Sequence, residues 1–476
     1  MSKAPSPPHL QSLAELTPGH GRGWLVGGAV RDELLGRETL DYDVAVDGDV
    51  EGLARALARA ARGHAFRLSE AFGAWRVRAR DGRWQIDLTP LFGETVEQDL
   101  ARRDLTINAI ARPIQAGAAD GAELIDPFGG VADLRARRLR MVGPESFRAD
   151  PLRTVRLVRL AVELQFEVDA LTAREAVTSA PKLGAVAPER VFAELCQIVS
   201  ADRAVAGFEL MERIGITRAV LPELIALRGV QQSDYHHLDV YDHTLSVLAE
   251  AIELERDPAP VFGASGGRVS AVLAEPLANE LTRGGGMRFG ALLHDIAKAA
   301  TRSVGESGRV GFRGHDLVGA EMTAEILTRL RASERLIAHV AALTRHHLRL
   351  GFLVHRRPLS RRDVYAYLAA CEPVEVDVTV FSVADRLATL GRNSDRAIEL
   401  HLELAGEIMP DALAWRASRP RPPIRGDRLG EAVGVQPGPQ LGRLLEELTV
   451  AAYANEVQGE KQAIAHARDW LAATGA

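Results

Sequence analysis

The sequence predicts an α+β protein in which a small mixed α/β head precedes an all-helical remainder. Between residues 22 and 145, short apolar runs alternate with helical stretches, which is typical of a compact mixed sheet with helices packed on it. From residue 146 onward helical periodicity dominates. The chain has 476 residues, 46% of them hydrophobic, which is more than one hydrophobic core usually spans, so we expect several domains.

The most specific pattern in the head is the order strand, glycine turn, helix, strand. Residues 24–26 predict a strand, Gly27 and Gly28 a turn, residues 29–36 a helix and residues 41–46 a second strand. The rest of the head is expected to form a helix at 50–62, strands at 66–68, 74–78 and 84–88, and a helix at 95–103.

Two carboxylates lie one residue apart in the second predicted strand. Because side chains alternate along a strand, Asp41 and Asp43 point to one face, and Tyr42 and Val44 point to the other. Such close like charges repel each other unless a cation neutralises them, and Mg²⁺ often binds carboxylates together with substrate phosphates. The glycine turn lets backbone N–H groups approach a phosphate at the next helix N-terminus, where Arg31 could bind phosphate oxygens. The pattern indicates metal-assisted nucleotidyl or phosphoryl transfer, although each piece alone also occurs as an ordinary turn or a solvated strand end.

The helical remainder is divided by its composition. Asp150 and Pro151 open a helix as N-cap and first helical residue, and more helices are expected near 170–178, 188–200, 203–214 and 240–254. The glycine-rich residues 256–288 predict a flexible insertion, and residues 418–423 predict a stiff proline-rich linker. With the head at 22–145, we expect a neck at 146–214, a body at 215–410 and a tail at 424–476.

The charge distribution favours a phosphate-bearing partner for one segment only. A net charge of −6 and a pI of about 6.2 argue against a generally basic nucleic-acid binder. Residues 135–159, however, contain eight arginines and two acidic residues. Cys196 and Cys371 are far apart and indicate neither a disulfide framework nor a zinc site. The start of the chain lacks a signal-peptide pattern and no apolar run is long enough to span a bilayer, so we expect a cytoplasmic protein with no membrane partner.

Four motifs, in one order, carry a family resemblance: Leu25–Asp32, Asp41–Asp43, Asp99–Ile110 and Asp150–Arg153. Together they resemble the class II tRNA nucleotidyltransferases and bacterial poly(A) polymerases. The resemblance implies template-independent addition of nucleotides from CTP and ATP to the 3′ end of tRNA, with release of pyrophosphate. It also implies that Asp41 and Asp43 are catalytic and bind Mg²⁺.

The same resemblance assigns nucleotide-binding residues. Gly28, Arg31 and Arg103 would hold the triphosphate, and Asp150 with Arg153 would pair with the edge of the incoming base. Arg156 and Arg159 continue the basic stripe and could contact nucleotide or tRNA phosphate. Two alternatives stay open, because Arg103 could form a structural ion pair with Asp104, and Asp150 could be only an N-cap. Asp87 is a further candidate metal-side carboxylate or an exposed strand residue.

Two departures from the family pattern bear on which bases are added. Many relatives carry a glutamate where this chain has Ala149, next to the presumed base-reading aspartate. Only Thr89–Gln98 separates the strand end at Asp87 and Leu88 from Asp99, and such a short segment resembles enzymes that add CC and leave the terminal A to a partner. We therefore predict CC addition, with complete CCA addition and poly(A) polymerase activity as alternatives.

A second site is expected in the body. His243, His294, Asp295 and Asp385 occur in the order H…HD…D, and imidazole and carboxylate ligands from separate helices can converge on one metal. The pattern resembles an HD phosphohydrolase domain, which implies a divalent metal (Mg²⁺, Mn²⁺ or Ni²⁺). Additional ligand candidates are His315, and His346 or His347. The implied substrates are phosphates or 2′,3′-cyclic phosphates at RNA ends. A third hypothesis is that the protein is an HD phosphohydrolase whose head only binds RNA or nucleotide.

Overall fold

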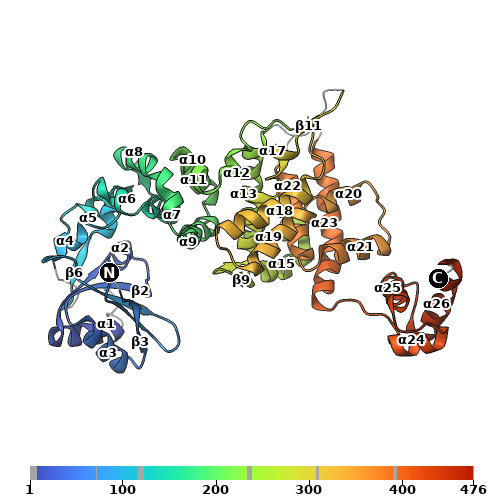
Figure 1. The fold of residues 1–476 in the computed structure, drawn as a ribbon, viewed down its shortest axis with the longest axis horizontal. Coiled ribbons are helices and arrows are strands. Elements are labelled where there is room, and N and C mark those ends of the chain that lie inside the picture. The colour runs from blue at the N-terminus through green and yellow to red at the C-terminus, as the bar shows by residue number, and fades with distance from the viewer. Residues whose placement is uncertain are drawn as a thin grey trace. The chain divides into compact units, whose positions relative to one another are not determined.

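The computed structural model describes residues 8–70, 72–115, 123–232, 238–306, 310–389 and 394–474. Packing divides the chain into two compact units, one of residues 1–186 and 209–219 and the other of residues 187–208 and 220–476 (Figure 1). The finer division into head, neck, body and tail stays a prediction.

The first unit contains the mixed sheet that the sequence predicts. Its six strands lie in the order β3-β4-β5-β2-β1-β6. Strands β2 and β5 run parallel, whereas the other neighbouring strands run antiparallel. The strands are β1 (Gly21–Val26), β2 (Asp41–Gly48), β3 (His64–Ser69), β4 (Ala74–Arg78), β5 (Gln85–Pro90) and β6 (Ala111–Pro113). The short strands β7 (Arg138–Leu139) and β8 (Glu167–Val168) form a separate parallel pair.

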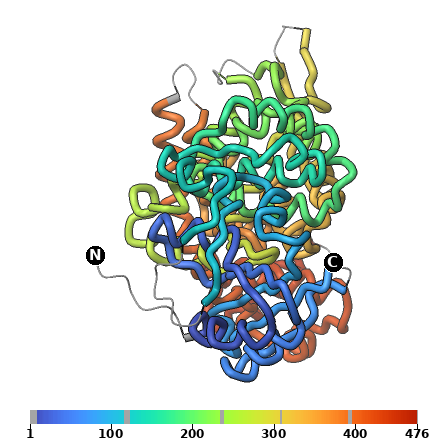
Figure 2. Tube along the Cα trace, turned by 90° about the vertical axis from the view of Figure 1, so that its left-hand side faces the viewer, coloured from blue at the N-terminus to red at the C-terminus, as the bar shows by residue number. Residues whose placement is uncertain are grey.

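Helices pack beside this sheet. The helix α3 begins where the Asp49 side chain accepts a hydrogen bond from the Gly52 N–H at 2.9 Å, and it buries Leu53 and Leu57. It contacts β4 and α1, and Figures 1 and 2 trace these elements in the blue part of the chain. The helices of this unit are α1 (Pro8–Leu16), α2 (Gly28–Leu34), α3 (Val50–Ala60), α4 (Val96–Leu100), α5 (Gly130–Arg135), α6 (Glu145–Ala149), α7 (Leu152–Leu164), α8 (Ala170–Ser179) and nearly all of α11 (Ile216–Val220), with 3₁₀ turns at Thr17–Gly19, Thr106–Asn108 and Ala180–Ala185. The helix α9 (Pro188–Ser200) belongs to the second unit, and α10 (Ala204–Arg213) contains the point in the chain where the two units divide.

The second unit is almost entirely helical. The helices α13, α16 and α22 pack on one another, and α16 also packs on α19. The elements are α12 (Pro222–Ile225), α13 (Val240–Arg256), α14 (Ala259–Phe262), α15 (Gly266–Leu273), β9 (Pro276–Ala278), β10 (Leu281–Thr282), α16 (Arg283–Leu293), α17 (Lys298–Thr301), β11 (Ser303–Val304), β12 (Val310–Gly311), α18 (His315–Arg329), α19 (Glu334–His346), α20 (Arg349–Val354), α21 (Arg361–Cys371), α22 (Glu375–Leu387), α23 (Ser394–Ala417), α24 (Gly426–Val433), α25 (Pro439–Tyr453) and α26 (Gly459–Thr474), with a 3₁₀ turn at Gly263–Ser265.

The predicted flexible insertion at 256–288 is wrong. This segment forms helices and a β-hairpin, and all three glycines of the run Gly284–Gly286 are buried in α16. The reason is close packing, because a Cβ atom on Gly286 would lie 2.8 Å from Leu277 and 2.9 Å from His339. The glycines therefore allow helices to approach one another and do not mark a loop.

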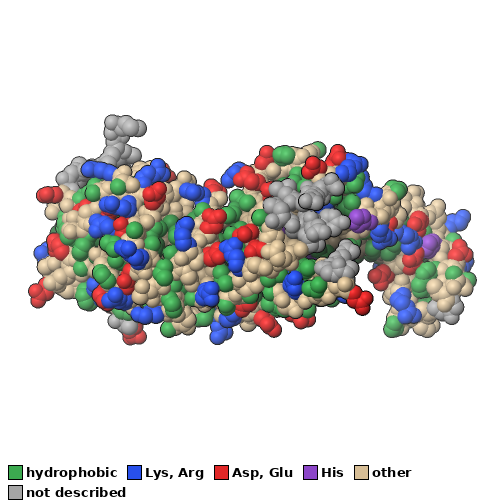
Figure 3. Space-filling view, turned by 90° about the horizontal axis from the view of Figure 1, so that it is seen from above, with side chains coloured by type: hydrophobic (Ala, Val, Ile, Leu, Met, Phe, Trp, Pro, Cys, Tyr) green, Lys and Arg blue, Asp and Glu red, His purple; other side chains and the backbone are tan. Residues whose placement is uncertain are grey.

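The last three helices of the second unit share a small core of their own. It includes Leu429, Leu444 and Leu448, all fully buried. Arg362 on α21 bonds Glu447 at 2.7 Å and Glu456 at 2.6 Å, which ties α25 to the rest of the unit. On the face drawn in Figure 3, basic and acidic side chains are interspersed. Among the described helices, none combines the length and the apolar character that crossing a membrane requires.

Candidate active sites

The first candidate site is the face of β2 that carries Asp41 and Asp43. Both residues are exposed, while Tyr42 between them and Val44 after them are buried on the other face, as the alternation predicts. The register sets Asp43 opposite Val26 of β1 on one side and Asp87 of β5 on the other. The sheet therefore brings three carboxylates together on one surface.

Asp43 is held in an environment that opposes its charge. Its carboxylate reaches solvent, yet protein atoms surround it closely. This desolvation raises the pKa of Asp43, Asp87 and Asp41 add to the rise, and Arg103 and Arg156 counteract it. A desolvated carboxylate beside a second carboxylate is a donor set that suits a hard divalent cation, so the residues present fit Mg²⁺.

Asp87 differs from the other two carboxylates because it already has a counterion. Arg76 on β4 donates to both of its oxygens, each at 2.7 Å. The bidentate pair neutralises Asp87 and fixes its orientation. Sequence reasoning missed Arg76, although the strand at residues 74–78 that carries it was predicted.

Gly27 provides the close approach that the glycine turn suggests. Its φ of 73° lies in the left-handed region, and a Cβ atom there would lie 2.7 Å from Arg103 Nη1 and 3.4 Å from Asp43 Oδ2. Glycine at this position thus leaves room for the Arg103 guanidinium next to Asp43. Arg103 itself bonds Asp99 at 3.2 Å, so the alternative ion pair with Asp104 is not formed.

Arg31 lies beside Gly28 and is held in place by two partners. Its Nε and Nη2 donate to Asp32 at 2.9 and 2.8 Å, and its Nη1 donates to Asn108 Oδ1 at 2.8 Å. Asn108 in turn donates to Asp104 Oδ1 at 2.9 Å. Arg31 is therefore pre-oriented at the glycine turn by residues of the Asp99–Ile110 motif.

The buried Asp104 joins this network to α7. It accepts hydrogen bonds from the Leu105 N–H at 2.8 Å and from Arg156 Nε at 3.1 Å. Although burial opposes its charge, the Arg156 charge and these hydrogen bonds lower the pKa of Asp104 to about 2. Arg156, predicted to contact nucleotide or RNA phosphate, thus has a structural partner in the head.

The remaining predicted nucleotide-binding residues lie at the start of α7 and along it. Asp150 Oδ1 accepts from the Leu152 N–H at 3.2 Å, which is a capping contact. Arg153 Nη1 donates to the Ser146 carbonyl at 3.1 Å, and Arg159 pairs with Glu163 at 3.1 Å. The structure shows the capping role of Asp150 and leaves its base-reading role as a prediction.

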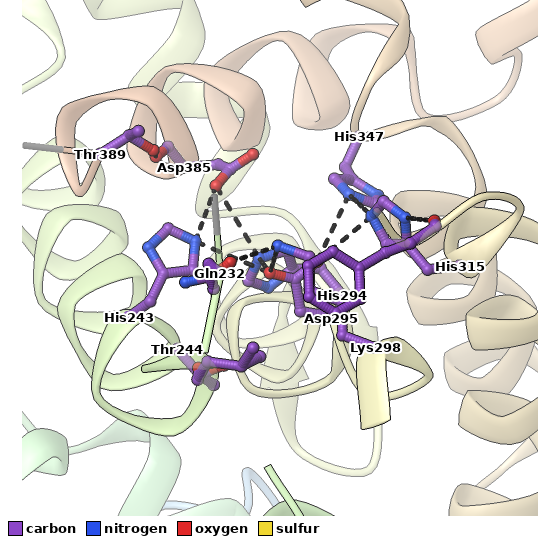
Figure 4. Close-up of polar contacts among 12 residues, drawn as sticks. Gln232, His243, Thr244, His294, Asp295, Lys298, His315, His347, Asp385 and Thr389 are labelled. Atoms are coloured by element: carbon purple, nitrogen blue, oxygen red, sulfur yellow. Dashed lines mark hydrogen bonds and ion pairs between the residues drawn. The ribbon is translucent and has the colours of Figure 1, made fainter. Parts of the chain in front are cut away.

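The second candidate site gathers the predicted HD residues from three helices. His243 comes from α13, His294 and Asp295 from the C-terminal end of α16, and Asp385 from α22 (Figure 4). His243 Nε2 lies 3.1 Å from Asp385 Oδ1 and 3.7 Å from Asp295 Oδ2. His294 Nε2 lies 3.1 Å from Asp295 Oδ2 and 3.8 Å from Asp385 Oδ1. All four predicted ligands converge.

Asp295 is shared with a second group of possible ligands. Its Oδ1 lies 3.3 Å from His315 Nε2 and 3.9 Å from His347 Nε2, and the two imidazoles are 3.3 Å apart. Asp295 therefore belongs to two triads that could each hold an ion, one with His243 and His294 and one with His315 and His347.

Of the two candidates His346 and His347, the structure brings only His347 into the group. His346 accepts a hydrogen bond from Arg349 Nε at 2.8 Å, outside the triads. Neighbouring helical residues point about 100° apart, so a one-residue difference decides which imidazole faces the site. His346 is therefore corrected to His347 as the ligand candidate.

The electrostatics of this group fit a cation. In the part of the chain that the structure describes, His294 Nε2 and both Asp295 oxygens are buried and make close ion-pair contacts, but none of them forms a hydrogen bond of good geometry. Although burial opposes it, His294 and Lys298 lower the pKa of Asp295 well below its usual range. Lys298 Nζ, which sequence reasoning missed, lies 2.7 Å from Asp295 Oδ2 and donates to Gln232 Oε1 at 2.7 Å. A carboxylate and imidazoles with unused lone pairs suit a divalent transition metal or Mg²⁺.

The fold and the two sites define a nucleotidyltransferase-type head joined to an HD-type helical unit. Three family models match: "Poly A polymerase head domain" at residues 23–91 and 84–140, "Probable RNA and SrmB- binding site of polymerase A" at 165–227, and "HD domain" at 240–390. Among curated proteins, an A-adding tRNA nucleotidyltransferase of Deinococcus radiodurans is 34% identical over 94% of this chain and 96% of its own. A CC-adding tRNA nucleotidyltransferase of Thermus thermophilus is 33% identical over 94% of this chain and 93% of its own.

This chain belongs to the tRNA nucleotidyltransferase family. Solved structures agree in fold. A CCA-adding enzyme in its apo form matches with a TM-score of 0.65 at 19% identity, covering 96% of this chain and 92% of that one. The Thermotoga maritima CCA-adding enzyme complexed with tRNA matches with a TM-score of 0.62 at 20% identity, covering 97% and 94%.

Proposed function

We propose that this protein adds nucleotides from CTP to the 3′ end of tRNA and stops after CC. The observation that carries the transfer chemistry is the pair Asp41 and Asp43, open to solvent beside Gly27, Arg31 and Arg103. The family relationship supports tRNA as the acceptor and CTP and ATP as the candidate nucleotides.

Different residues of the head would bind the metal, the triphosphate and the base. Asp41 and Asp43 would hold Mg²⁺, which when bound would help to deprotonate the 3′-hydroxyl and stabilise charge on the α-phosphate. Arg103, admitted by the missing side chain of Gly27, lies where it can bind triphosphate oxygens. Arg31, fixed by Asp32 and Asn108, adds a second oriented guanidinium. Asp150 and Arg153 as readers of the base edge remain part of the proposal.

The segment that follows β5 supports CC addition. Residues 91–95 connect β5 directly to α4. The Phe92 N–H bonds Asp99 at 3.3 Å, the Glu94 N–H bonds Gln98 at 2.8 Å, and Arg102 lies 3.5 Å from the centre of the Phe92 ring. A connection that is short and held at three points cannot make large excursions over the site. Overall identity does not decide the matter, because the A-adding and CC-adding relatives are 34% and 33% identical.

The test uses three tRNA transcripts, ending before CCA, after the first C and after CC. With CTP and ATP present, we expect the first two to be extended to CC and the third to remain unchanged. Addition of a single A to the third transcript alone would identify an A-adding enzyme. A complete CCA end on all three would refute the CC proposal, and a long A tail would indicate a poly(A) polymerase.

A second function is favoured by the HD-type cluster. We propose that His243, His294, Asp295 and Asp385 bind a divalent metal (Mg²⁺, Mn²⁺ or Ni²⁺) and hydrolyse phosphate or 2′,3′-cyclic phosphate esters at RNA ends. The buried ligand atoms of His243, His294 and Asp295, which all lie within 4.8 Å of one another, support metal binding. Hydrolysis of 2′,3′-cyclic AMP by the full chain, measured after chelation and re-addition of each metal, tests it. No hydrolysis with any of the three ions would leave the metal with a structural role.

A further inference from the structure

The cavity beside the HD-type cluster extends well beyond the ligand residues. Its volume is about 390 Å³, within the range of roughly 300–1,000 Å³ typical of small-molecule sites. One wall is formed by α22 and the residues just after it, with Ser382, Asp385, Arg386 and Thr389 at positions i, i+3, i+4 and i+7. The ligand candidates Asp295, His315, His347 and Asp385 all line the cavity, and Ser382, Arg386 and Thr389 add three positions on this wall that are not ligand candidates.

The facing wall repeats this spacing. Leu348, Gly351, Phe352 and His355, along α20 and its flanks, line the cavity at the same i, i+3, i+4 and i+7 intervals. This wall is largely apolar, and the Phe352 side chain is 66% exposed. An aromatic ring left open at a cavity mouth offers a stacking surface to a flat ligand group.

Arg386 on the α22 wall is a cation with no hydrogen bond or ion pair to any residue that the structure describes. Its Nε is buried and has no hydrogen-bond partner among the described residues, and no ion pair joins its guanidinium to a described carboxylate. The neighbouring His401 is already bonded to Ser382 Oγ at 3.0 Å. A half-buried guanidinium left with an unused donor costs stability unless a ligand anion satisfies it.

We propose that Arg386 binds the phosphate of a nucleotide phosphoester in this cavity and that Phe352 stacks on its base. Arg386 lines the same cavity as Asp385 and Asp295, so an anion that it binds can lie close to the proposed metal position. Lys298, which also lines the cavity, is bonded to Asp295 and Gln232. Among the described residues that line the cavity, Arg386 is a cation whose buried Nε has no hydrogen-bond partner. The inference rests on the proposed phosphohydrolase function and names the residues that recognise its substrate.

The test is calorimetric titration of adenosine 3′-monophosphate and of inorganic phosphate into the full chain, saturated with Mn²⁺. Arg386→Met should weaken binding of both probes by about 10- to 100-fold, because it removes a charge-assisted hydrogen bond. Arg386→Lys should restore part of that loss. Phe352→Ala should weaken adenosine 3′-monophosphate binding by roughly tenfold through lost stacking and leave phosphate binding unchanged. Arg345→Met, an exposed arginine on α19, is the matched control and should bind both probes as the wild type does.

The outcomes separate this inference from the phosphohydrolase proposal. Wild-type protein that hydrolyses 2′,3′-cyclic AMP, with Arg386→Met binding both probes normally, would overturn the inference and leave the hydrolase proposal standing. Probe binding that depends on Arg386 and Phe352, without hydrolysis, would support the inference and refute the hydrolase proposal. If the wild type binds neither probe, the inference is overturned. Should Arg386→Met unfold at a lower temperature, Arg386→Lys and Phe352→Ala carry the test.

Discussion

In the first unit, Asp41 and Asp43 are exposed on one face of a sheet, whereas in the second unit His294 and Asp295 are buried among other imidazoles. The open site offers only carboxylate oxygens, so a metal there needs substrate phosphates to complete its coordination. The enclosed site offers nitrogen and oxygen ligands from three helices before any substrate arrives. From this contrast we expect a metal in the head to arrive with the nucleotide and a metal in the HD-type unit to stay bound without substrate.

The largest effect on activity is expected when one carboxylate of the open site is removed. Asp43→Asn should lower the rate of nucleotide addition by about 10³-fold or more, because metal stabilisation of the transferring phosphate is worth several kcal/mol. Single-turnover addition of labelled CTP to a tRNA transcript measures this loss. Asp47→Asn, on the same strand and paired with Arg22 at the surface, is the matched control and should retain activity. A loss below tenfold for Asp43→Asn would contradict the catalytic assignment.

Removing an imidazole of the enclosed site should impair metal binding and hydrolysis and leave nucleotide addition unchanged. His294→Ala should weaken metal binding by at least about 100-fold and abolish hydrolysis, because one ligand of the metal is removed. Metal content after gel filtration reports the first effect, and nucleotide addition should be preserved. His346→Ala, outside the triads, should keep the metal. Loss of nucleotide addition together with the metal would mean that the metal is structural.

The head also contains a buried charged residue, Asp104, that we expect to stabilise the fold. Asp104→Asn should reduce the free energy of unfolding at neutral pH by about 2 kcal/mol, since a buried charge-assisted contact with Arg156 is lost. Because the folded pKa of Asp104 is lowered to about 2, its stabilisation is complete above pH 4 to 5. It is lost as the pH falls from about 4 to 2.

Denaturant unfolding at pH 7 and pH 3 measures this difference between wild type and Asp104→Asn. The two proteins should approach each other in stability at the lower pH. Asp47→Asn breaks an exposed pair and should cost less than about 1 kcal/mol at either pH. An undiminished gap at pH 3 would show that Asp104 does not stabilise the head through its charge.

The smallest expected effect concerns the third carboxylate of the open site. Asp87→Asn should change nucleotide addition only about two- to fivefold, because Arg76 already neutralises Asp87 through two hydrogen bonds. The same single-turnover assay applies. A loss as large as that of Asp43→Asn would make Asp87 a metal ligand.

Sequence patterns predicted the elements that bear the sites better than the contacts within them. The strand with Asp41 and Asp43 and the convergence of the four HD residues followed from alternation and from motif order. The pairing of Asp87 with Arg76 and of Arg156 with Asp104 could not be predicted from the sequence, because these partners are set by sheet register and by packing between distant segments. The choice between His346 and His347 depended on helix phase, which a helix boundary uncertain by one residue cannot fix.

The glycine-rich helix α16 has a consequence for how the enclosed site is assembled during folding. Each glycine costs about 1 kcal/mol of helix propensity relative to alanine, so the stretch with Gly284, Gly286 and Gly290 has little tendency to be helical alone. Contacts with Leu277, His339 and Leu343 must therefore be in place before the helix is stable. His294 and Asp295 follow its last turn, so the nascent chain cannot present them as a preformed pair. We therefore expect a metal to bind this unit only after the surrounding helices have packed.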